Sequence, residues 1–173
     1  CRPGPAAGPA AGLAADTMHP MLISCFVAPD DEQAAQVIDW PSGPVEPAGD
    51  AEGQDAFPVV DTKIEPVVTL TKLAEILSGT PYDELAADKR ISTLLAQKDE
   101  YEVLVLTVSD SVKAALAGAS DEDLVRAAGP WSQIEEFHGL VDPDDLLEVM
   151  RELGLLARQA VDSGHSMYVW WCA

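Results

Sequence analysis

Residues 101–108, YEVLVLTV, are apolar at almost every position. A strand with one face in water alternates apolar and polar residues, whereas a strand covered on both faces is apolar nearly throughout. Residues 21–28 (MLISCFVA) and the closing stretch 165–172 (HSMYVWWC) are also dense in apolar, β-branched and aromatic residues. Strand-like and helical segments alternate along the chain, so the sequence predicts a single compact domain of the α/β or α+β class.

The longest helical pattern begins after Asp142, which precedes a proline, and ends at Gly164. The closing strand follows this long C-terminal helix directly. A second amphipathic pattern covers Val67–Ser78 and stops at Gly79. Shorter helices are expected after Asp30 or Asp31, after Ser109 or Asp110, and over 121–129, where Ser120 and Asp123 approximate a capping box. The sequence thus predicts three to four strands and four to six helices.

Two segments are too rich in proline and glycine to form regular elements. Residues 1–17 consist mainly of Ala, Pro and Gly, so we expect a disordered tail before a domain that spans 18–173. Met18 is then the expected native start, and a competing hypothesis is a lipoprotein that is anchored through an acylated Cys1. The stretch 39–61 carries four prolines and three glycines, and we expect a mobile acidic loop there.

The chain is strongly acidic, with 30 Asp and Glu against 10 Lys and Arg and a formal net charge of −20. Nucleic acids and anionic membranes both attract cationic side chains, so neither is expected as a partner. The charge permits high solubility, a basic protein partner, or an organism whose proteins are acidic in general. The cysteines show no zinc-site spacing, and no apolar stretch reaches the ~20 residues that span a bilayer, so a cytoplasmic protein is expected. The sequence does not set the oligomeric state.

The segment WSQIEEFH at 131–138 is the strongest candidate for a site. Glu135, Glu136 and His138 are candidate catalytic residues, because glutamate and histidine in one cleft can serve as general acid and base. Trp131 and Phe137 are candidate ligand-binding residues, since an aromatic face such as that of Trp131 attracts a cation. The alternative interpretation is that this corner between two helices docks on the core and leaves both glutamates in water.

Other motifs that could carry chemistry are better explained as helix caps. Asp142, Asp144 and Asp145 could gather with His138 round a metal, but acidic residues also favour a helix N-terminus. Ser109-Asp110-Ser111 follows a strand, as nucleophiles do in α/β enzymes, yet it lacks the GxSxG pattern. The sequence contains no glycine-rich phosphate loop and no histidine pair with metal-site spacing, so neither a cofactor nor a metal is expected.

The aromatic residues of the closing strand divide between its two faces. Alternation places Tyr168, Trp170 and Cys172 on one face of the sheet and Val169 and Trp171 on the other. Side chains this large exceed what one strand face can bury. We therefore expect burial on both faces rather than an exposed ligand or partner surface.

The order of elements resembles that of the YfbM-like bacterial proteins. A strand near the start is followed by DTKIEPVVTLTKLAEILSGTPYDE, by helices around SVKAALAGASDEDLVRA, and by a long helix and the closing GHSMYVWWCA. Ile76–Gly79 corresponds to the helix stop of Leu-Leu-x-Gly type in that family. The Trp and His that usually precede this stop are missing, and Ile64, Glu65 and Pro66 occupy the region. The Ala- and Asp-rich composition is also similar to that of acidic actinobacterial proteins without an established activity. Both resemblances imply a fold and carry no functional residue.

Two functions are compatible with the sequence. The first is a non-enzymatic binding or interaction protein, for example of the immunity type, which blocks a basic toxin through charge complementarity. The second is a small enzyme or ligand-binding domain that uses the corner at 131–138. The first is favoured because the sequence contains no catalytic constellation of recognisable spacing.

Overall fold

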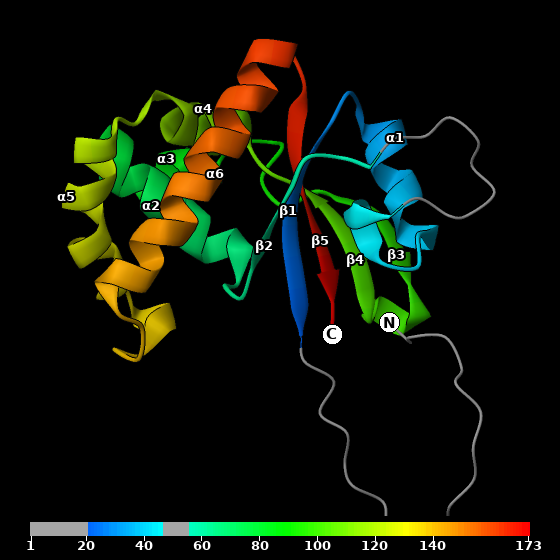
Figure 1. Ribbon diagram of the computed structural model, residues 1–173, viewed down its shortest axis with the longest axis horizontal. Coiled ribbons are helices and arrows are strands. Elements are labelled where there is room, and N and C mark those ends of the chain that lie inside the picture. Colours follow the sequence, from blue (N-terminus) through cyan, green and yellow to red (C-terminus); the bar gives the residue numbers. More distant parts are fainter. Residues whose placement is uncertain (1–20, 47–55) are drawn as a thin grey trace, which may run out of the picture.

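A computed structural model describes residues 21–46 and 56–173 of the chain. The strands of this part form one antiparallel sheet in the order β2-β1-β5-β4-β3 (Figure 1). β1 and β5 pair over seven positions at the centre, from Leu22 opposite Cys172 to Ala28 opposite Ser166. The strand bounds are β1 (Leu22–Ala28), β2 (Val59–Thr62), β3 (Leu94–Lys98), β4 (Val103–Thr107) and β5 (Ser166–Cys172).

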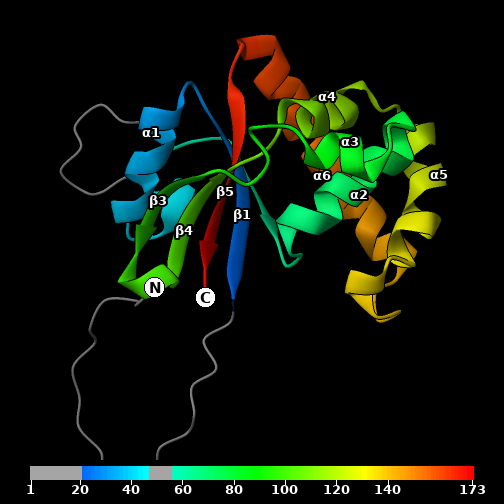
Figure 2. The same cartoon turned by 180° about the vertical axis from the view of Figure 1, so that it is seen from behind.

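Helices cover both faces of the sheet, as the front and back views show (Figures 1 and 2). One face is covered by α2 (Pro66–Ser78), α3 (Tyr82–Ala86), α4 (Asp110–Gly118), α5 (Asp121–Ser132) and α6 (Pro143–Ser163). The opposite face carries α1 (Asp31–Gln36) and the short 3-10 helices η1 (Val37–Asp39) and η2 (Gly43–Val45). Two further 3-10 turns are η3 (Asp99–Tyr101) and η4 (Glu135–Phe137). The predicted α+β domain, with a long C-terminal helix before the final strand, is confirmed.

The predicted capping residues set the helix ends. Ser120 and Asp123 form the complete capping box of α5, because each side chain accepts a backbone N–H of the other. Asp142 accepts the N–H of Asp144 at the start of α6, over 2.8 Å. Gly79 and Gly164 end α2 and α6 in the left-handed conformation, with φ of 74° and 69°, which glycine adopts at little cost.

The alternation predicted for the closing strand divides the interior into two cores. Met167 and Val169 of β5 point into the helix-side core, where they join residues such as Leu73, Met150 and Leu153. Tyr168, Trp170 and Cys172 point into the aromatic-side core, with Phe26, Trp40, Val103 and Val105. Each large apolar side chain that is fully buried contributes roughly 1.5–3 kcal/mol. Both faces of the sheet are therefore buried, as the sequence predicts.

The sheet has one strand more than the upper limit of the prediction. β3 was missed because it is an edge strand, in which Leu94, Gln97 and Lys98 are exposed and the register shifts between Leu94 and Ala96. The turn that joins β3 to β4 contains no glycine or proline, although residues 99–101 all have positive φ. The apolar piece at 91–96 (ISTLLA) is short and overlaps β3 only in part, and no glycine or proline marks the turn in the sequence.

Several predictions about loops and tails fall partly or wholly outside the described residues. Residues 1–17, Met18 and the proposed lipid anchor at Cys1 all lie there. In the stretch 39–61, positions 47–55 are also outside, but the described flanks pack on the sheet: Trp40 and Pro44 are buried, and β2 begins at Val59. The flanks of the predicted loop therefore belong to the fold.

Candidate functional site

The aromatic residues of the 131–138 segment lie in the helix-side core. α5 continues through Pro130 to Ser132, past the end expected at Gly129, and this carries Trp131 into the interior. Trp131 is fully buried, and its Nε1 donates to the carbonyl of Thr69 over 2.9 Å. Phe137 packs edge-on against the indole, with 5.3 Å between the ring centroids. Both aromatic side chains act as core residues that dock the helical corner.

The three polar candidates of the same segment do not converge. Glu135 and His138 are exposed. Glu136 accepts two hydrogen bonds from Lys72, at 2.8 and 2.9 Å, and this ion pair lowers the pKa of the Glu136 carboxyl. None of these three side chains lines any of the five best-formed pockets in the described part of the chain. Their catalytic role stays a prediction that the geometry does not favour.

The remaining sequence motifs form caps. Ser109 Oγ accepts the N–H of Val112 over 3.2 Å, and Asp142 caps α6. Ser111 Oγ donates to Asp88 over 3.1 Å. Within 21–46 and 56–173, no group of three or more His, Cys, Asp or Glu side chains is placed to hold a metal ion.

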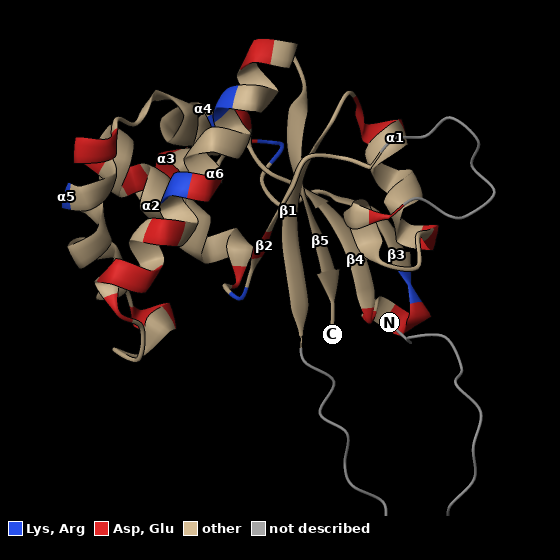
Figure 3. Cartoon of the chain, viewed as in Figure 1, with Lys and Arg blue, Asp and Glu red and all other residues tan. Residues whose placement is uncertain are grey.

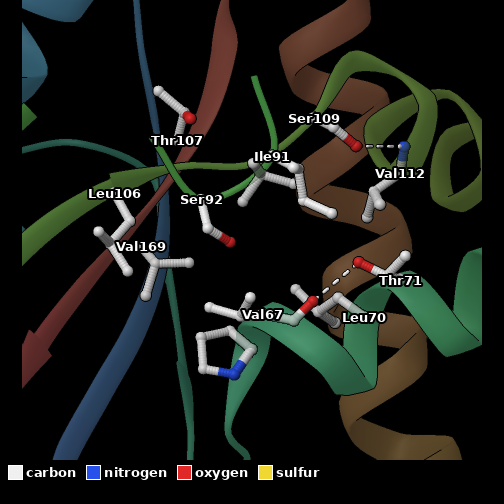
Figure 4. A pocket seen from close by; sticks show the side chains of 12 residues that line it. Val67, Leu70, Thr71, Ile91, Ser92, Leu106, Thr107, Ser109, Val112 and Val169 are labelled. Atoms are coloured by element: carbon white, nitrogen blue, oxygen red, sulfur yellow. Dashed lines mark hydrogen bonds between the residues drawn. The ribbon is translucent and has the colours of Figure 1, made fainter. Parts of the chain in front are cut away.

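A pocket between α2 and the sheet is too small for a ligand (Figure 4). Its volume is about 20 Å³, which is room for roughly one water molecule. Two of the polar side chains around it are already bonded, since Thr71 Oγ donates to the Val67 carbonyl and Ser109 Oγ accepts from Val112. This pocket is a packing gap of the helix-side core.

A larger cavity lies on the aromatic side, between η1, the β3–β4 turn and the end of β5. We call it the Trp170 cavity; it measures about 500 Å³, within the range of small-ligand sites. Its lining includes Asp39, Trp40, Lys98, Asp99, Glu102 and Trp170. These residues come from three separate parts of the sequence, which the sheet brings together at one end.

The inner part of the Trp170 cavity is aromatic and apolar. Trp170, Trp40 and Val103 line it and are buried, with 3%, 6% and 6% of their surfaces exposed. Trp40 stacks on Phe57 at a centroid distance of 5.3 Å and an interplanar angle of 6°. Gly43 lies against the Trp170 ring with φ of +61°, and a Cβ there would sit 2.7 Å from Trp170 Cδ2. The indole is thus held in a fixed position.

The outer part of the Trp170 cavity is charged. Lys98 Nζ is 3.1 Å from Asp39 Oδ1 in an exposed ion pair that joins β3 to η1. Asp99 and Glu102 are exposed carboxylates on the turn, and neither has an ion pair within the described part of the chain. The rim therefore presents three carboxylates and one ammonium group that is already paired.

The turn that carries the rim carboxylates has an unusual backbone. Asp99, Glu100 and Tyr101 have φ of 52°, 54° and 77°, which places three consecutive non-glycine residues in the left-handed region. Each such residue costs roughly 1–2 kcal/mol. Strain of this kind concentrates at functional sites, where the surrounding fold maintains it. Besides the cavity itself, this strained turn is a second feature that distinguishes this end of the sheet.

The third feature is the indole nitrogen of Trp170. Trp170 Nε1 is buried and has no hydrogen-bond partner among the described residues. Leaving a buried donor unsatisfied costs roughly 1–3 kcal/mol. Trp131, the other deeply buried tryptophan, has its nitrogen satisfied by Thr69. Arg90 Nε is a second buried donor without a partner, and Arg90 does not line the cavity, so unmet donors are not confined to this site.

A polar network beside the cavity holds α1 on the sheet. Asp31 accepts two hydrogen bonds from Arg90, at 2.8 and 3.1 Å, and one from the hydroxyl of Tyr168 at 2.8 Å. The Arg90 hydrogen bond lowers the pKa of Asp31. Burial, together with the bond to Asp31, raises the pKa of Tyr168 to about 12. This network holds α1 in place, and η1 and Trp40 follow α1 directly in the chain.

Sequence reasoning predicted the burial of Trp170 but not the cavity beside it. The cavity depends on Trp40, which lies in a segment expected to be mobile, and on a hairpin that carries no turn residue. The absence of Lys and Arg between Met18 and Thr62 is a sequence signal that bears on it, because it leaves the η1 side of the rim acidic. Patterns of local spacing compare residues a few positions apart, so they cannot show that positions 39, 99 and 170 lie close together in the fold.

None of the helices in the described ranges is long and apolar enough to cross a membrane. Comparison of the chain with protein-family models, with curated proteins and with solved structures finds no match, so the resemblance to the YfbM-like proteins stays a prediction.

Proposed function

We propose that this protein is a non-enzymatic binding protein of the immunity type, which takes a basic protein partner at the Trp170 cavity. The observation that carries the proposal is the make-up of that cavity: the nearly buried Trp40 and Trp170 border a lining that is mostly polar and includes three carboxylates. The stem of a lysine or arginine side chain packs on apolar surface while its cationic end stays near water. A cation is also attracted to the face of a tryptophan.

The charge of the whole molecule supports the same class of partner. Six cationic side chains in the described ranges already have acidic neighbours: Lys72, Arg90, Lys98, Lys113, Arg126 and Arg151. Most of the Asp and Glu side chains in these ranges have no such pair, and Figure 3 shows acidic residues on both sides of the sheet. An acidic surface of this kind accelerates association with a basic protein. The wide distribution of charge attracts the partner, and the cavity supplies the specific contact.

The test is binding of a peptide of ten lysines, measured by fluorescence anisotropy at about 150 mM salt, where long-range attraction is screened. The rim variant Asp99→Asn with Glu102→Gln removes two charges beside the cavity. Its matched control, Glu148→Gln with Glu152→Gln, removes two exposed charges from α6 on the far side of the sheet. We expect the rim variant to bind roughly tenfold more weakly, which is about 1.4 kcal/mol, and the control to change little.

Two results would contradict the proposal. If the peptide does not bind the wild-type protein, the basic-partner function fails. If the rim variant and the α6 control weaken binding equally, the attraction is a property of total charge and the cavity is not its site. The other hypothesis, a small enzyme or ligand-binding domain at 131–138, has no comparable support, because its polar side chains do not converge on a cavity.

A further inference from the structure

We infer that a second cavity of this protein binds a neutral aromatic compound that carries an amide-like edge. The cavity lies at the end of the sheet where β1 leads to α1 and α6 leads to β5 (Figure 1). We call it the His165 cavity; its volume is about 400 Å³, and its lining includes Val27, Gln33, Trp40, Phe57, Gln159 and His165. This ligand site goes beyond the proposed function, and neither proposal depends on the other.

The apolar part of the His165 cavity is held in place by the backbone. Trp40 and Phe57 stack with 5.3 Å between their ring centroids. The N–H of Phe57 donates to the Pro44 carbonyl over 3.2 Å. The N–H of Val27 donates to the Pro58 carbonyl over 3.0 Å. This aromatic surface is therefore preformed, as in most ligand sites, and it favours an aromatic ligand because rings pack edge-to-face or offset.

The polar part of the His165 cavity lies at the end of α6. The backbone of His165 is fixed on both sides, because its N–H donates to the Ala160 carbonyl over 2.8 Å and its own carbonyl accepts from Lys113 Nζ over 3.2 Å. Gln159 is exposed and His165 is half-exposed, so a ligand can reach both side chains.

These two side chains have hydrogen-bonding capacity to spare. Neither the Gln159 carboxamide nor the His165 imidazole has a hydrogen bond or ion pair within the described part of the chain. A carboxamide offers donors and acceptors, and a neutral imidazole offers one of each. The ligand group that fits this part of the cavity therefore both donates and accepts, as an amide does.

The His165 cavity differs in charge from the two other large cavities. None of its described lining residues is Asp, Glu, Lys or Arg, although the chain has a net charge of −20. Three carboxylates and a lysine line the Trp170 cavity, and Glu84 and Asp88 line a groove between α3 and α4. An ion that enters an uncharged, mostly apolar site loses its hydration without gaining a charged partner. The lining therefore selects a neutral ligand.

The experiment titrates the ¹⁵N-labelled wild-type protein with four small probes and follows its N–H signals by NMR. Benzamide carries both the aromatic ring and the amide. Benzoate and benzamidinium have nearly the same shape with a negative and a positive charge, and acetamide keeps the amide without the ring. The solution is held at about pH 8, where a free histidine is neutral, and at about 150 mM salt, which screens long-range attraction.

The reporters are the side-chain NH₂ signals of Gln159 and the backbone N–H signal of His165. The indole N–H of Trp131 is the internal control, because it bonds to Thr69 in the helix-side core. We expect benzamide to bind in the millimolar range, as a fragment of its size does, and to move the reporter signals alone. The other probes should bind at least about fivefold more weakly, because the ions lose hydration and acetamide lacks the ring contact.

A pair of glutamine variants tests the polar contact. Gln159→Ala assigns the Gln159 signals and should weaken benzamide binding about threefold to fivefold, because one hydrogen bond is lost. Its matched control, Gln97→Ala, removes an exposed glutamine from β3, which does not line the cavity. The control should bind benzamide as the wild type does, and the His165 N–H signal measures both affinities.

Four results would overturn the inference. If benzamide moves neither reporter, or moves the Trp131 signal as much, the cavity is not its site. If benzamidinium binds as tightly as benzamide, the acidity of the chain governs binding and the lining does not select a neutral ligand. If acetamide binds as tightly, the aromatic ring makes no contact. If Gln97→Ala weakens binding as much as Gln159→Ala, the hydrogen bond to Gln159 is wrong.

Discussion

Trp131 and Trp170 are both almost completely buried, yet they serve different purposes in the two cores. Trp131 is the centre of the helix-side core, where Thr69 accepts its N–H and Phe137 packs against its ring. Trp170 borders a cavity on the aromatic side, and its N–H has no partner among the described residues. A tryptophan whose every group is satisfied stabilises the fold. A tryptophan that borders a cavity is a candidate for binding.

The comparison separates what the sequence predicted from what it did not. Trp131 had two interpretations, a ligand-binding residue or one that docks a helical corner on the core, and its complete burial favours the second. The predicted burial of Trp170 is confirmed. The cavity beside Trp170 was not predicted, because the other side chains that line it come from η1 and from the β3–β4 turn.

The largest effect that separates the two residues is on stability. Trp131→Ala should lower the free energy of unfolding by about 4 kcal/mol, because it leaves a cavity in a closely packed core. Trp170→Ala should cost at least about 1 kcal/mol less, since one side of that ring already borders a cavity and its nitrogen gains no hydrogen bond. Urea denaturation monitored by circular dichroism measures both. Equal losses would show that Trp170 is an ordinary core residue.

The next largest effect on the free energy of unfolding tests how closely Gly43 of η2 packs against the Trp170 ring. Gly43→Ala should lower the free energy of unfolding by about 2–3 kcal/mol, because a side chain at its positive φ is strained and its Cβ would collide with the indole. Gly118→Ala is the matched control, since nothing lies within 4 Å of a Cβ at this exposed end of α4. The control should be neutral or slightly stabilising. A tolerated Gly43→Ala would mean that the ring is free to move.

A smaller effect is the dependence of the free energy of unfolding on alkaline pH, which we expect from Tyr168 on the aromatic side of the sheet. The folded-state pKa of Tyr168 is about 12, above the roughly 10 of a free tyrosine. As pH rises, the unfolded chain therefore releases its proton first, and the stabilisation from this group is full below about pH 10 and lost towards pH 12. We expect a loss of about 2 kcal/mol over this window in urea unfolding. Tyr168→Phe should flatten that slope, and an unchanged slope would contradict the assignment.

The smallest effect on the free energy of unfolding is expected at the rim of the Trp170 cavity. Lys98→Ala should change the free energy of unfolding by about 0.5 kcal/mol or less, because its ion pair with Asp39 is exposed. The same substitution should strengthen binding of the ten-lysine peptide a few-fold, roughly 0.5–1 kcal/mol, because it removes the one cation that lines the cavity among the described residues. Anisotropy titration measures this change. Weaker binding after the substitution would show that Lys98 contacts the ligand itself.

Much of the fold follows from local sequence patterns, and the candidate site does not. The capping box at Ser120 and the stops at Gly79 and Gly164 involve residues a few positions apart, so their spacing is visible in the chain. β3 escapes the same reasoning, because an exposed edge strand needs no apolar run. The Trp170 cavity escapes it for another reason: it exists only once β5, η1 and the turn at Asp99 meet at one end of the sheet.

The most direct test of the Trp170 cavity as a binding site compares two conservative variants in two assays. Trp170→Phe should weaken binding of the ten-lysine peptide by at least about fivefold, roughly 1 kcal/mol, and change the urea midpoint only slightly. Trp131→Phe should lower the urea midpoint clearly and leave the affinity of the folded protein unchanged. If Trp170→Phe binds as tightly as the wild type, or if both variants lose affinity in proportion to their stability, the cavity is not the binding site.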